Sequence, residues 1–205
     1  MVTAQVDPLG QLYRARSTPQ LVGVPAMRFL SVDGVGDPNT AAAYADAVQA
    51  LYSIAYAAKF TLKRTLGAAL KVSPLETLWW AEDMSVFTTA RRDDWCWTAM
   101  IRQPDVVTED LIAANVATAD AKRPRPVLHD LELRTFDEGA AAQVLHVGPY
   151  AAEGPTIERL HAFIHEQGFD FDGRVNKHHE IYLSDPRRSA PDKLRTIIRQ
   201  SYAVA

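Results

Sequence analysis

Aromatic side chains gather in one part of this sequence, where they could stack against a flat or hydrophobic ligand. All four tryptophans fall in two strand-like runs, as Trp79, Trp80, Trp95 and Trp97. Tyr52 and Tyr56 stand one helical turn apart just before them. Indole and phenol groups can also supply hydrogen bonds at the edge of a pocket. The alternative is that these rings form a hydrophobic core, which is the usual place of aromatic residues in strands, and different rings can serve each purpose.

A carboxylate near the end of the chain is the second feature that could do chemistry. Residues 178–186 read HHEIYLSDP, with Glu180 inside a β-rich run. Because side chains alternate along a strand, Glu180 shares a face with His178 and Tyr182. The other face, which carries Ile181, is more apolar and is predicted to meet the helices. Glu180 then points into solvent or into a groove, and spacing alone favours solvent because a buried carboxylate costs several kcal/mol unless it is paired.

The remaining reactive residue types form no recognisable motif. His161 and His165 lie one turn apart but lack the glutamate of a zinc-protease motif, and the adjacent His178 and His179 face opposite ways. Cys96, between two tryptophans, is predicted to be a small buried hydrophobe. We therefore expect no metal and no cofactor.

The composition is that of an ordinary soluble protein. The 205 residues carry a formal net charge of -3 and contain a single cysteine, which excludes an internal disulfide. The modest charge offers no field for nucleic acid, and no apolar run approaches the roughly 20 residues of a membrane helix. We expect a cytoplasmic protein, monomer or homodimer, with neither nucleic acid nor membrane as a partner.

The hydrophobic pattern predicts an N-terminal arm over residues 1–20 and a single domain over 21–205. In the first half we expect strands at 21–32, 74–80 and 95–101, helices at 38–66 and 105–120, and a connector at 121–126. Asp37 is the expected N-cap of the first helix, with Pro38 at its first position. The second half is predicted to contain strands at 127–135, 141–147, 178–183 and 194–202, and a helix at 153–167 that Gly168 ends.

The two halves repeat the same order of elements. Val35-Gly36-Asp37-Pro38 and Val147-Gly148-Pro149-Tyr150 each link a strand to a helix through a glycine turn. The chain is therefore predicted to contain two copies of one βαββ unit, the first at about 21–120 and the second at about 127–205. Paired sheets would leave a groove at the pseudo-symmetry axis, where ligand pockets tend to form.

Several segments, which occur in the same order along the chain as in the family, resemble the stand-alone form of the GyrI-like proteins, which share a SOUL/GyrI-like fold. Their residues in this chain are Gly34–Asn39, Leu51-Tyr52 with Tyr56 and Lys59, Pro74–Glu76 with Trp79-Trp80, Trp95–Trp97, Met100-Ile101, Gln103–Asp105, Gln143–Tyr150 and, most specifically, His178–Arg188. The resemblance implies an α+β fold in which duplicated βαββ units form a continuous antiparallel sheet, with helices on one side and a central ligand groove.

The resemblance also implies a hydrophobic, aromatic small molecule as the ligand. Regulatory relatives bind lipophilic, often cationic drugs over a glutamate at the position of Glu180, and stand-alone relatives are associated with hydrolysis of cyclopropane-bearing genotoxins of the duocarmycin and yatakemycin type. Glu180 would then be a general base that activates water, with Tyr182 beside it. The expected groups for stacking and for an oxyanion donor are Tyr52, Tyr56, Trp80, Trp97 and Tyr150.

Two other functions fit the same resemblance. One is non-catalytic binding or sequestration of hydrophobic, often cationic drugs, with Glu180 as the counter-ion. The other is inhibition of DNA gyrase, which rests on fold alone and is the least supported. Trp79 and Trp80 point opposite ways along their strand, and Trp80 is the one expected to face the groove.

Overall fold

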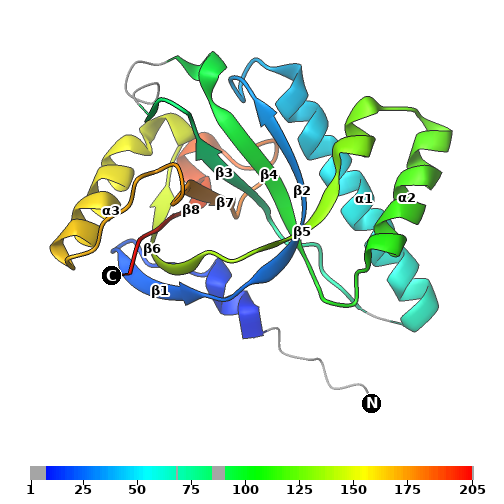
Figure 1. The fold of residues 1–205 in the computed structure, drawn as a ribbon, viewed down its shortest axis with the longest axis horizontal. Coiled ribbons are helices and arrows are strands. Elements are labelled where there is room, and N and C mark those ends of the chain that lie inside the picture. Colours follow the sequence, from blue (N-terminus) through cyan, green and yellow to red (C-terminus); the bar gives the residue numbers. More distant parts are fainter. Residues whose placement is uncertain (1–7, 68, 85–90, 205) are drawn as a thin grey trace. The chain divides into compact units, whose positions relative to one another are not determined.

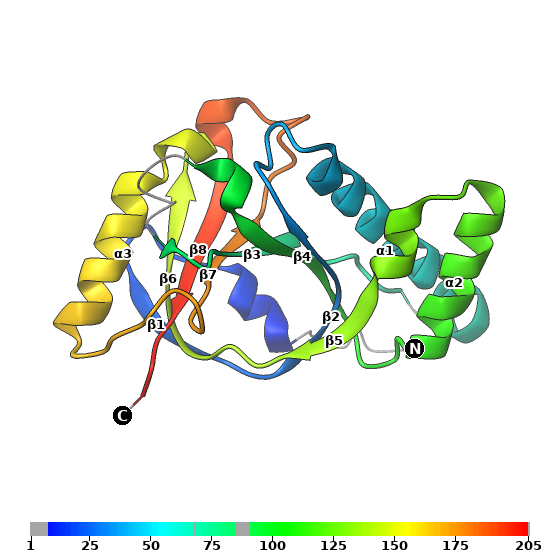
Figure 2. The same cartoon turned by 45° about the horizontal axis from the view of Figure 1, so that its top comes forward.

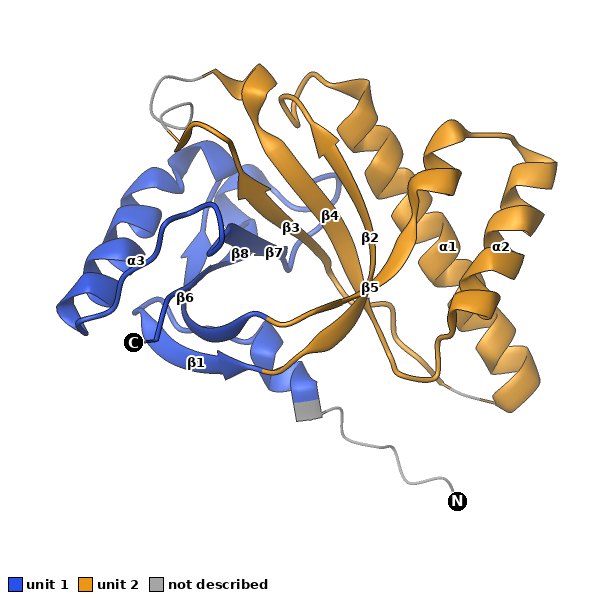
Figure 3. Ribbon diagram, in the orientation of Figure 1, with its two compact units in different colours: residues 1–24, 138–205 blue, residues 25–137 orange. Residues whose placement is uncertain are grey.

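The computed structural model describes residues 8–67, 69–84 and 91–204. The chain forms two compact units, and Figure 3 colours them separately: unit 1 joins residues 1–24 to 138–205, and unit 2 comprises residues 25–137. Each unit combines an antiparallel sheet with packed helices. The predicted α+β class is confirmed.

Unit 2 is built on the longest helix of the described residues. Its main elements are β2 (Met27–Val35), α1 (Ala42–Leu66), β3 (Leu75–Trp80), β4 (Cys96–Gln103), α2 (Glu109–Lys122) and β5 (Glu132–Phe136). The strands lie in the order β3-β4-β2-β5, all antiparallel. Helix α1 packs its buried stripe, which includes Leu51, Ile54 and Leu62, over β2 and β4. Helix α2 lies beside α1 (Figure 1).

Unit 1 takes its strands from both ends of the chain. Its main elements are the 3-10 helix Pro8–Tyr13, β1 (Gln20–Val24), β6 (Gly139–Val147), α3 (Gly154–Glu166), β7 (His178–Tyr182) and β8 (Arg195–Ser201). The strand order is β7-β8-β6-β1, again antiparallel. Helix α3 covers β6 and β8 (Figure 2), where Leu160 and Ile164 pack against Val144, Ile198 and Tyr202.

The predicted duplication is visible in the two strand orders. β2-α1-β3-β4 in unit 2 corresponds to β6-α3-β7-β8 in unit 1, and each set of three strands is extended by one further strand beside β2 or β6. These further strands are exchanged: β1 precedes β2 in the chain but pairs with β6, while β5 precedes β6 but pairs with β2. The matching turns use Gly36 and Gly148, with φ of 118° and 142°, a region that favours glycine.

The duplication also pairs positions across the two sheets. In unit 2, Trp97 lies opposite Gly34 on one neighbouring strand and Trp79 on the other. In unit 1, Thr196 lies opposite His146 and Tyr182. Gly34 and His146 both stand two residues before the turn glycine, so the three positions in one unit correspond to the three in the other.

Several predicted boundaries are wrong for local reasons. The strand expected at 21–32 is two strands, because Pro25 cannot donate a hydrogen bond to a ladder and the chain turns there into β2. Asp37 does not cap α1: its carboxylate accepts from the backbone N–H of Asn39 at 2.9 Å, and the helix begins at Ala42 after Ala41. The helix expected at 105–120 begins at Glu109, where Thr108 accepts from the Leu111 N–H.

One further segment departs from the expected pattern. The first part of the strand predicted at 127–135 is the 3-10 helix Pro126–Asp130, and only β5 is extended. Part of the connection between the two tryptophan-rich strands, residues 85–90, lies outside the described residues, as do residues 1–7 of the predicted arm. Among the helices that the structure describes, none has the length and apolarity needed to cross a membrane.

Candidate functional site

Glu180 lies on β7 with both carboxylate oxygens engaged. The Tyr182 hydroxyl donates to Oε2 at 2.7 Å, and Nε2 of His178 lies 3.3 Å from Oε1. The Glu180 side chain is 15% exposed. Tyr150, which precedes α3, meets the Tyr182 ring edge to face with centroids 5.6 Å apart. The carboxylate is thus held in a fixed direction, within an aromatic and mostly buried setting, yet retains an accessible edge.

The face of β7 that meets the helix is opposite to the one predicted. Glu180 pairs in register with Ile198, whose side chain packs against α3, so the Glu180 face is the helix-facing side. The Ile181 face is also buried, because the 3-10 helix near the N-terminus covers it: the Arg199 guanidinium donates to the Leu12 carbonyl at 2.7 Å. With both faces covered, the apolar count of each face could not identify the helix side.

That opposite face contains a buried ionic cluster. Glu138 lies 2.9 Å from His179 and 3.0 Å from Arg199, and Arg199 also donates to the side-chain carbonyl of Gln143. Burial acts to raise the pKa of Glu138, but attraction by His179 and Arg199 outweighs it and lowers this pKa to about 2. His179 is 0% exposed, so this cluster is a structural feature of the core.

Glu153 is an ionisable residue of the helix-facing side that the sequence analysis did not single out. It immediately precedes α3, is 4% exposed, and makes no side-chain capping hydrogen bond. Burial, reinforced by the negative charge of Glu180, raises the pKa of Glu153 to about 9, while the nearby Thr196 hydroxyl acts in the opposite direction. Glutamate is not among the preferred N-cap residues, which is the sequence signal that could have drawn attention to it.

Four polar atoms on the helix-facing side of unit 1 are buried without a hydrogen-bond partner in the part of the chain that the structure describes. They are Oε1 of Glu153, the Thr196 hydroxyl, Nε2 of His146 and Nε2 of His161. His146 and Thr196 are register partners, and the other ring nitrogen of His146 lies 3.1 Å from the Thr156 hydroxyl of α3. Together with Glu180, they make the helix-facing side of unit 1 rich in groups that can exchange protons or bind polar atoms.

His161 of α3 belongs to the same polar side. Burial, helped by the positive potential of His178 and His165, lowers the pKa of His161 to about 4, and an interaction with Gln200 opposes this. His161 is therefore neutral at pH 7. In the described residues no group of three or more His, Cys, Asp or Glu is arranged to hold a metal ion.

The aromatic residues predicted in unit 2 divide between the core and the surface of that unit. Trp97 is 1% exposed, with Tyr44 of α1 packed edge-on at 5.1 Å between centroids. Trp79 also packs against Tyr44, whereas Trp80, on the opposite face of β3, is half-buried. Trp79 and Trp97 thus lie beneath α1, and Trp80 keeps an accessible edge.

Tyr52 and Tyr56 form part of a ladder along α1. The Tyr52 and Tyr56 rings, and then the Tyr56 and Phe60 rings, follow at 6.3 Å between centroids. Tyr56 is 45% exposed, and the Lys59 ammonium lies 5.6 Å from its ring centroid. Of the predicted site residues, Glu180, Tyr182 and Tyr150 are brought into one cluster in unit 1, and Tyr52 and Tyr56 into one row on α1.

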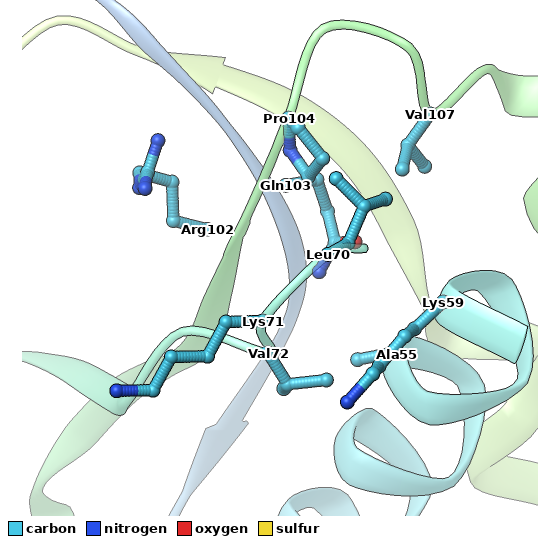
Figure 4. A pocket seen from close by; sticks show the side chains of 9 residues that line it. All are labelled: Ala55, Lys59, Leu70, Lys71, Val72, Arg102, Gln103, Pro104 and Val107. Carbon is cyan, nitrogen blue, oxygen red and sulfur yellow. The ribbon is translucent and has the colours of Figure 1, made fainter. Parts of the chain in front are cut away.

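A pocket in unit 2 has none of the predicted site residues in its lining (Figure 4). It is a small depression with a cavity volume of about 10 Å³, between α1 and the segments that flank β3 and β4. Its lining combines three cationic side chains with apolar ones: Lys59, Lys71, Arg102, Ala55, Leu70, Val72, Gln103, Pro104 and Val107. The pocket is therefore basic and lacks aromatic rings.

The duplicated α+β fold and the polar, aromatic-edged site are those of a small-molecule-binding domain. The chain belongs to the GyrI-like family: the model of the GyrI-like small molecule binding domain matches residues 17–200. This confirms the resemblance inferred from the sequence motifs. A small molecule is accordingly the kind of ligand that the domain binds.

Solved structures from Listeria innocua resemble the whole chain. An uncharacterised conserved protein is 40% identical with a TM-score of 0.86, covering 95% of this chain and 96% of its own. Two structures described as hydrolases are 36% and 38% identical, each with a TM-score of 0.82 and the same coverage. Among curated proteins, none matches the chain.

Proposed function

We propose that this protein is a hydrolase that opens the cyclopropane ring of duocarmycin- and yatakemycin-type genotoxins, with Glu180 as the general base. The observation that carries the proposal is the fixed Glu180 carboxylate, oriented by the Tyr182 hydroxyl at 2.7 Å beside the Tyr150 ring. The description of two relatives of 36% and 38% identity as hydrolases adds support for an enzyme.

The chemistry requires a base next to a planar electrophile. In these compounds a strained spirocyclopropane is conjugated to a dienone. Glu180 would orient a water and remove its proton as the water oxygen attacks the ring carbon. The breaking carbon–carbon bond sends its electron pair to the dienone oxygen, which becomes a phenolate stabilised by a phenol or indole donor. Addition of water removes the electrophile that alkylates DNA.

The aromatic side chains have a positioning role in this proposal. Tyr150 and Tyr182 border Glu180 in unit 1 and would stack on a flat ligand there. In unit 2, Tyr52, Tyr56 and Trp80 carry accessible ring surface and stay candidates for stacking. Trp97 is buried under Tyr44, so in this proposal it supports the aromatic surface from below. A soluble protein acting in the cytoplasm suits the removal of a DNA-damaging compound.

A second candidate function is binding without catalysis. The same carboxylate, beside the Tyr150 and Tyr182 rings, suits a lipophilic cation, because the carboxylate is mostly shielded from water and the faces of aromatic rings attract cations. Glu180 would then be a counter-ion, and the protein would sequester hydrophobic, often cationic drugs.

Incubation with a duocarmycin-type compound separates these candidates. Mass spectrometry should detect the water adduct with the native protein, and Glu180→Gln should reduce its formation at least a hundredfold. Glu166→Gln, an exposed change on α3, is the matched control and should retain full activity. Turnover equal to buffer, or equal in Glu180→Gln, would refute the general-base proposal.

Binding can be measured independently by tryptophan fluorescence. If Glu180 is only a counter-ion, Glu180→Gln should lose affinity for a lipophilic cationic dye and keep affinity for a neutral aromatic compound of similar size. Equal affinity of both proteins for the cationic dye would argue against the binding candidate.

A further inference from the structure

We propose that Glu153 is a second functional carboxyl of the Glu180 site: the two share one proton, which Glu153 holds. Glu153 is thereby a positioning residue that acts through Glu180. Its part in turnover rests on the proposed function, whereas the sharing of the proton does not.

The geometry places Glu153 where a negative charge is poorly supported. Its side chain is 4% exposed, Oε1 has no hydrogen-bond partner in the described residues, and it forms no helix cap. Transfer of an unpaired carboxylate into such a setting is costly, and protonation is the usual response. The N-terminal end of α3 favours the anion, but this interaction is weak compared with the cost of burying an unpaired carboxylate.

The neighbours of Glu153 explain why it is this carboxyl that carries the proton. Glu180 accepts from the Tyr182 hydroxyl and lies beside His178, whereas Oε1 of Glu153 has no hydrogen-bond partner among the described residues. Contacts connect the two carboxyls: the Glu153 N–H donates to the Tyr150 carbonyl at 3.1 Å, and the Tyr150 ring packs against Tyr182. Two carboxylates close together disfavour simultaneous ionisation, as in known carboxyl pairs. Glu180 has the better hydrogen-bond support, so the proton is assigned to Glu153.

The other titratable groups on this side of unit 1 include His146 on β6, His178 and Tyr182 on β7, Tyr150 before α3, and His161 and His165 on α3. His161 is neutral at pH 7, with a pKa of about 4 caused first by burial. Among these groups, the charge that acts on Glu153 is that of Glu180.

The pair has a defined role in the proposed reaction. The water oxygen bonds to the ring carbon, the carbon–carbon bond breaks, and the electron pair moves to the dienone oxygen. The proton lost by the water goes to Glu180 and then to the phenolate oxygen, so the net change is addition of one water. Throughout, protonated Glu153 keeps a second negative charge away from Glu180, which leaves Glu180 able to give its proton up again.

The proton can be observed without substrate. In protein labelled with ¹³C-glutamate, infrared spectra at pH 7 should contain a carboxylic acid band that disappears above about pH 9, the value to which burial and Glu180 raise the pKa of Glu153. Glu153→Gln should abolish the band. Glu180→Gln should keep it but move its disappearance to lower pH, because the opposing charge is gone.

Stability supplies an independent measurement. A carboxyl whose pKa is raised in the folded state binds a proton that the unfolded chain has lost, so stability falls as the pH rises between the unfolded and folded pKa values. Between pH 7 and 9 the folding equilibrium constant should fall about tenfold per pH unit more steeply in the native protein than in Glu153→Gln. Identical slopes would overturn the proposal.

These measurements separate the pair from the reaction. A carboxylic acid band assigned to Glu153, without any turnover of a duocarmycin-type compound, would sustain the pair and refute the hydrolase. Absence of the band at pH 7, or a band unmoved in Glu180→Gln, would overturn the pair whatever the activity. Should Glu153→Gln fail to fold, the shift in Glu180→Gln still decides. If both proposals hold, Glu153→Gln should lose the alkaline dependence of turnover.

Discussion

The two units build the same helix–sheet contact from residues of opposite kinds. In unit 2 the position before the turn is Gly34, and the Trp97 indole lies directly over it. In unit 1 the equivalent position is His146, and the residue opposite is the small Thr196. One unit pairs a missing side chain with a large ring, and the other pairs a large ring with a small hydroxyl. The volume is filled in both cases.

This exchange of sizes decides which unit can hold ionisable groups. The Trp97 ring and Tyr44 fill the space under α1 with apolar surface. Under α3, the equivalents of Trp97 and Tyr44 are Thr196 and Thr156, which leave room for Glu153. On the neighbouring strands, β3 and β7, the residue two positions before Trp79 is Thr77, and the residue two positions before Tyr182 is Glu180. The same fold therefore has an aromatic core under the helix in unit 2 and a polar site under the helix in unit 1.

The faces of the two sheets that point away from α1 and α3 also differ, with an ionic residue in unit 1 where unit 2 has an apolar one. A substitution there should have the largest effect on stability. Arg199 of unit 1 corresponds to Met100 of unit 2, by the register of each with its neighbours. Arg199→Met places the unit 2 residue type in unit 1 and leaves Glu138 buried without the Arg199 guanidinium as its partner. Urea unfolding should show a loss of about 3–5 kcal/mol. Arg134→Met, which breaks two surface ion pairs, with Asp33 and Glu132, is the control and should cost no more than about 1–2 kcal/mol.

The ionic cluster should also make unit 1 sensitive to acid. Because attraction by His179 and Arg199 outweighs burial and lowers the pKa of Glu138 to about 2, the stabilisation is complete above the ordinary value of 4.5. It should be lost as the pH falls from 4.5 towards 2, by up to about 3 kcal/mol. Unfolding curves measured across this range should show the loss, and Glu138→Gln should flatten it. An equal slope in both proteins would contradict the prediction.

A methyl group at Gly34 tests the aromatic side of the comparison. A Cβ there would lie 2.1 Å from the Trp97 ring, which has no room to retreat beneath α1. Gly34→Ala should cost about 2–3 kcal/mol in urea unfolding. Gly23→Ala on β1 is the matched control, since its Cβ would meet nothing within 4 Å. A loss of the same size in both variants would show that the cost is not the contact with Trp97.

The smallest effect compares two phenol hydroxyls that bond to the equivalent strand positions. Tyr44 lies 2.8 Å from the Thr77 hydroxyl, and Tyr182 donates to the Glu180 carboxylate at 2.7 Å. Hydrogen bonds to charged groups are the stronger, so Tyr182→Phe should cost about 1–2 kcal/mol and Tyr44→Phe about 0.5–1 kcal/mol. A double-mutant cycle of Tyr182→Phe with Glu180→Gln should give a coupling energy, and its absence would contradict the bond's charge-assisted character.

Much of the fold could be predicted from the sequence because the repeated glycine turns and the apolar periods are local signals. The errors arose where the same short run of residues is compatible with more than one local structure. Asp37 before Pro38 suits a helix cap, but its side chain forms a turn with Asn39 instead. Pro25 breaks a run of alternating residues that otherwise predicts one strand. The exchange of β1 and β5 between the units depends on pairing between distant segments, which periodicity does not encode.

The candidate site was predicted less completely. Glu180, Tyr182 and Tyr150 stand in recognisable motifs, and the structure clusters them. Glu153 was missed because its unusual character comes from burial under α3 and from the charge of Glu180, neither of which is visible in its sequence neighbours. The side of β7 that meets α3 was predicted wrongly because the opposite face is also buried. The segment near the N-terminus lies against that face, where the Leu12 carbonyl accepts from Arg199.

The exchange of β1 and β5 has a consequence for the order in which the chain can assemble during synthesis. Every strand of unit 2 lies between residues 25 and 137, so the four strands of unit 2 can pair as soon as β5 leaves the ribosome. The strand β1 is made earlier than all of them, yet its partner β6 is among the later segments. The nascent chain must therefore carry an unpaired strand while unit 2 folds, and a chaperone that shields strand edges would find its substrate there.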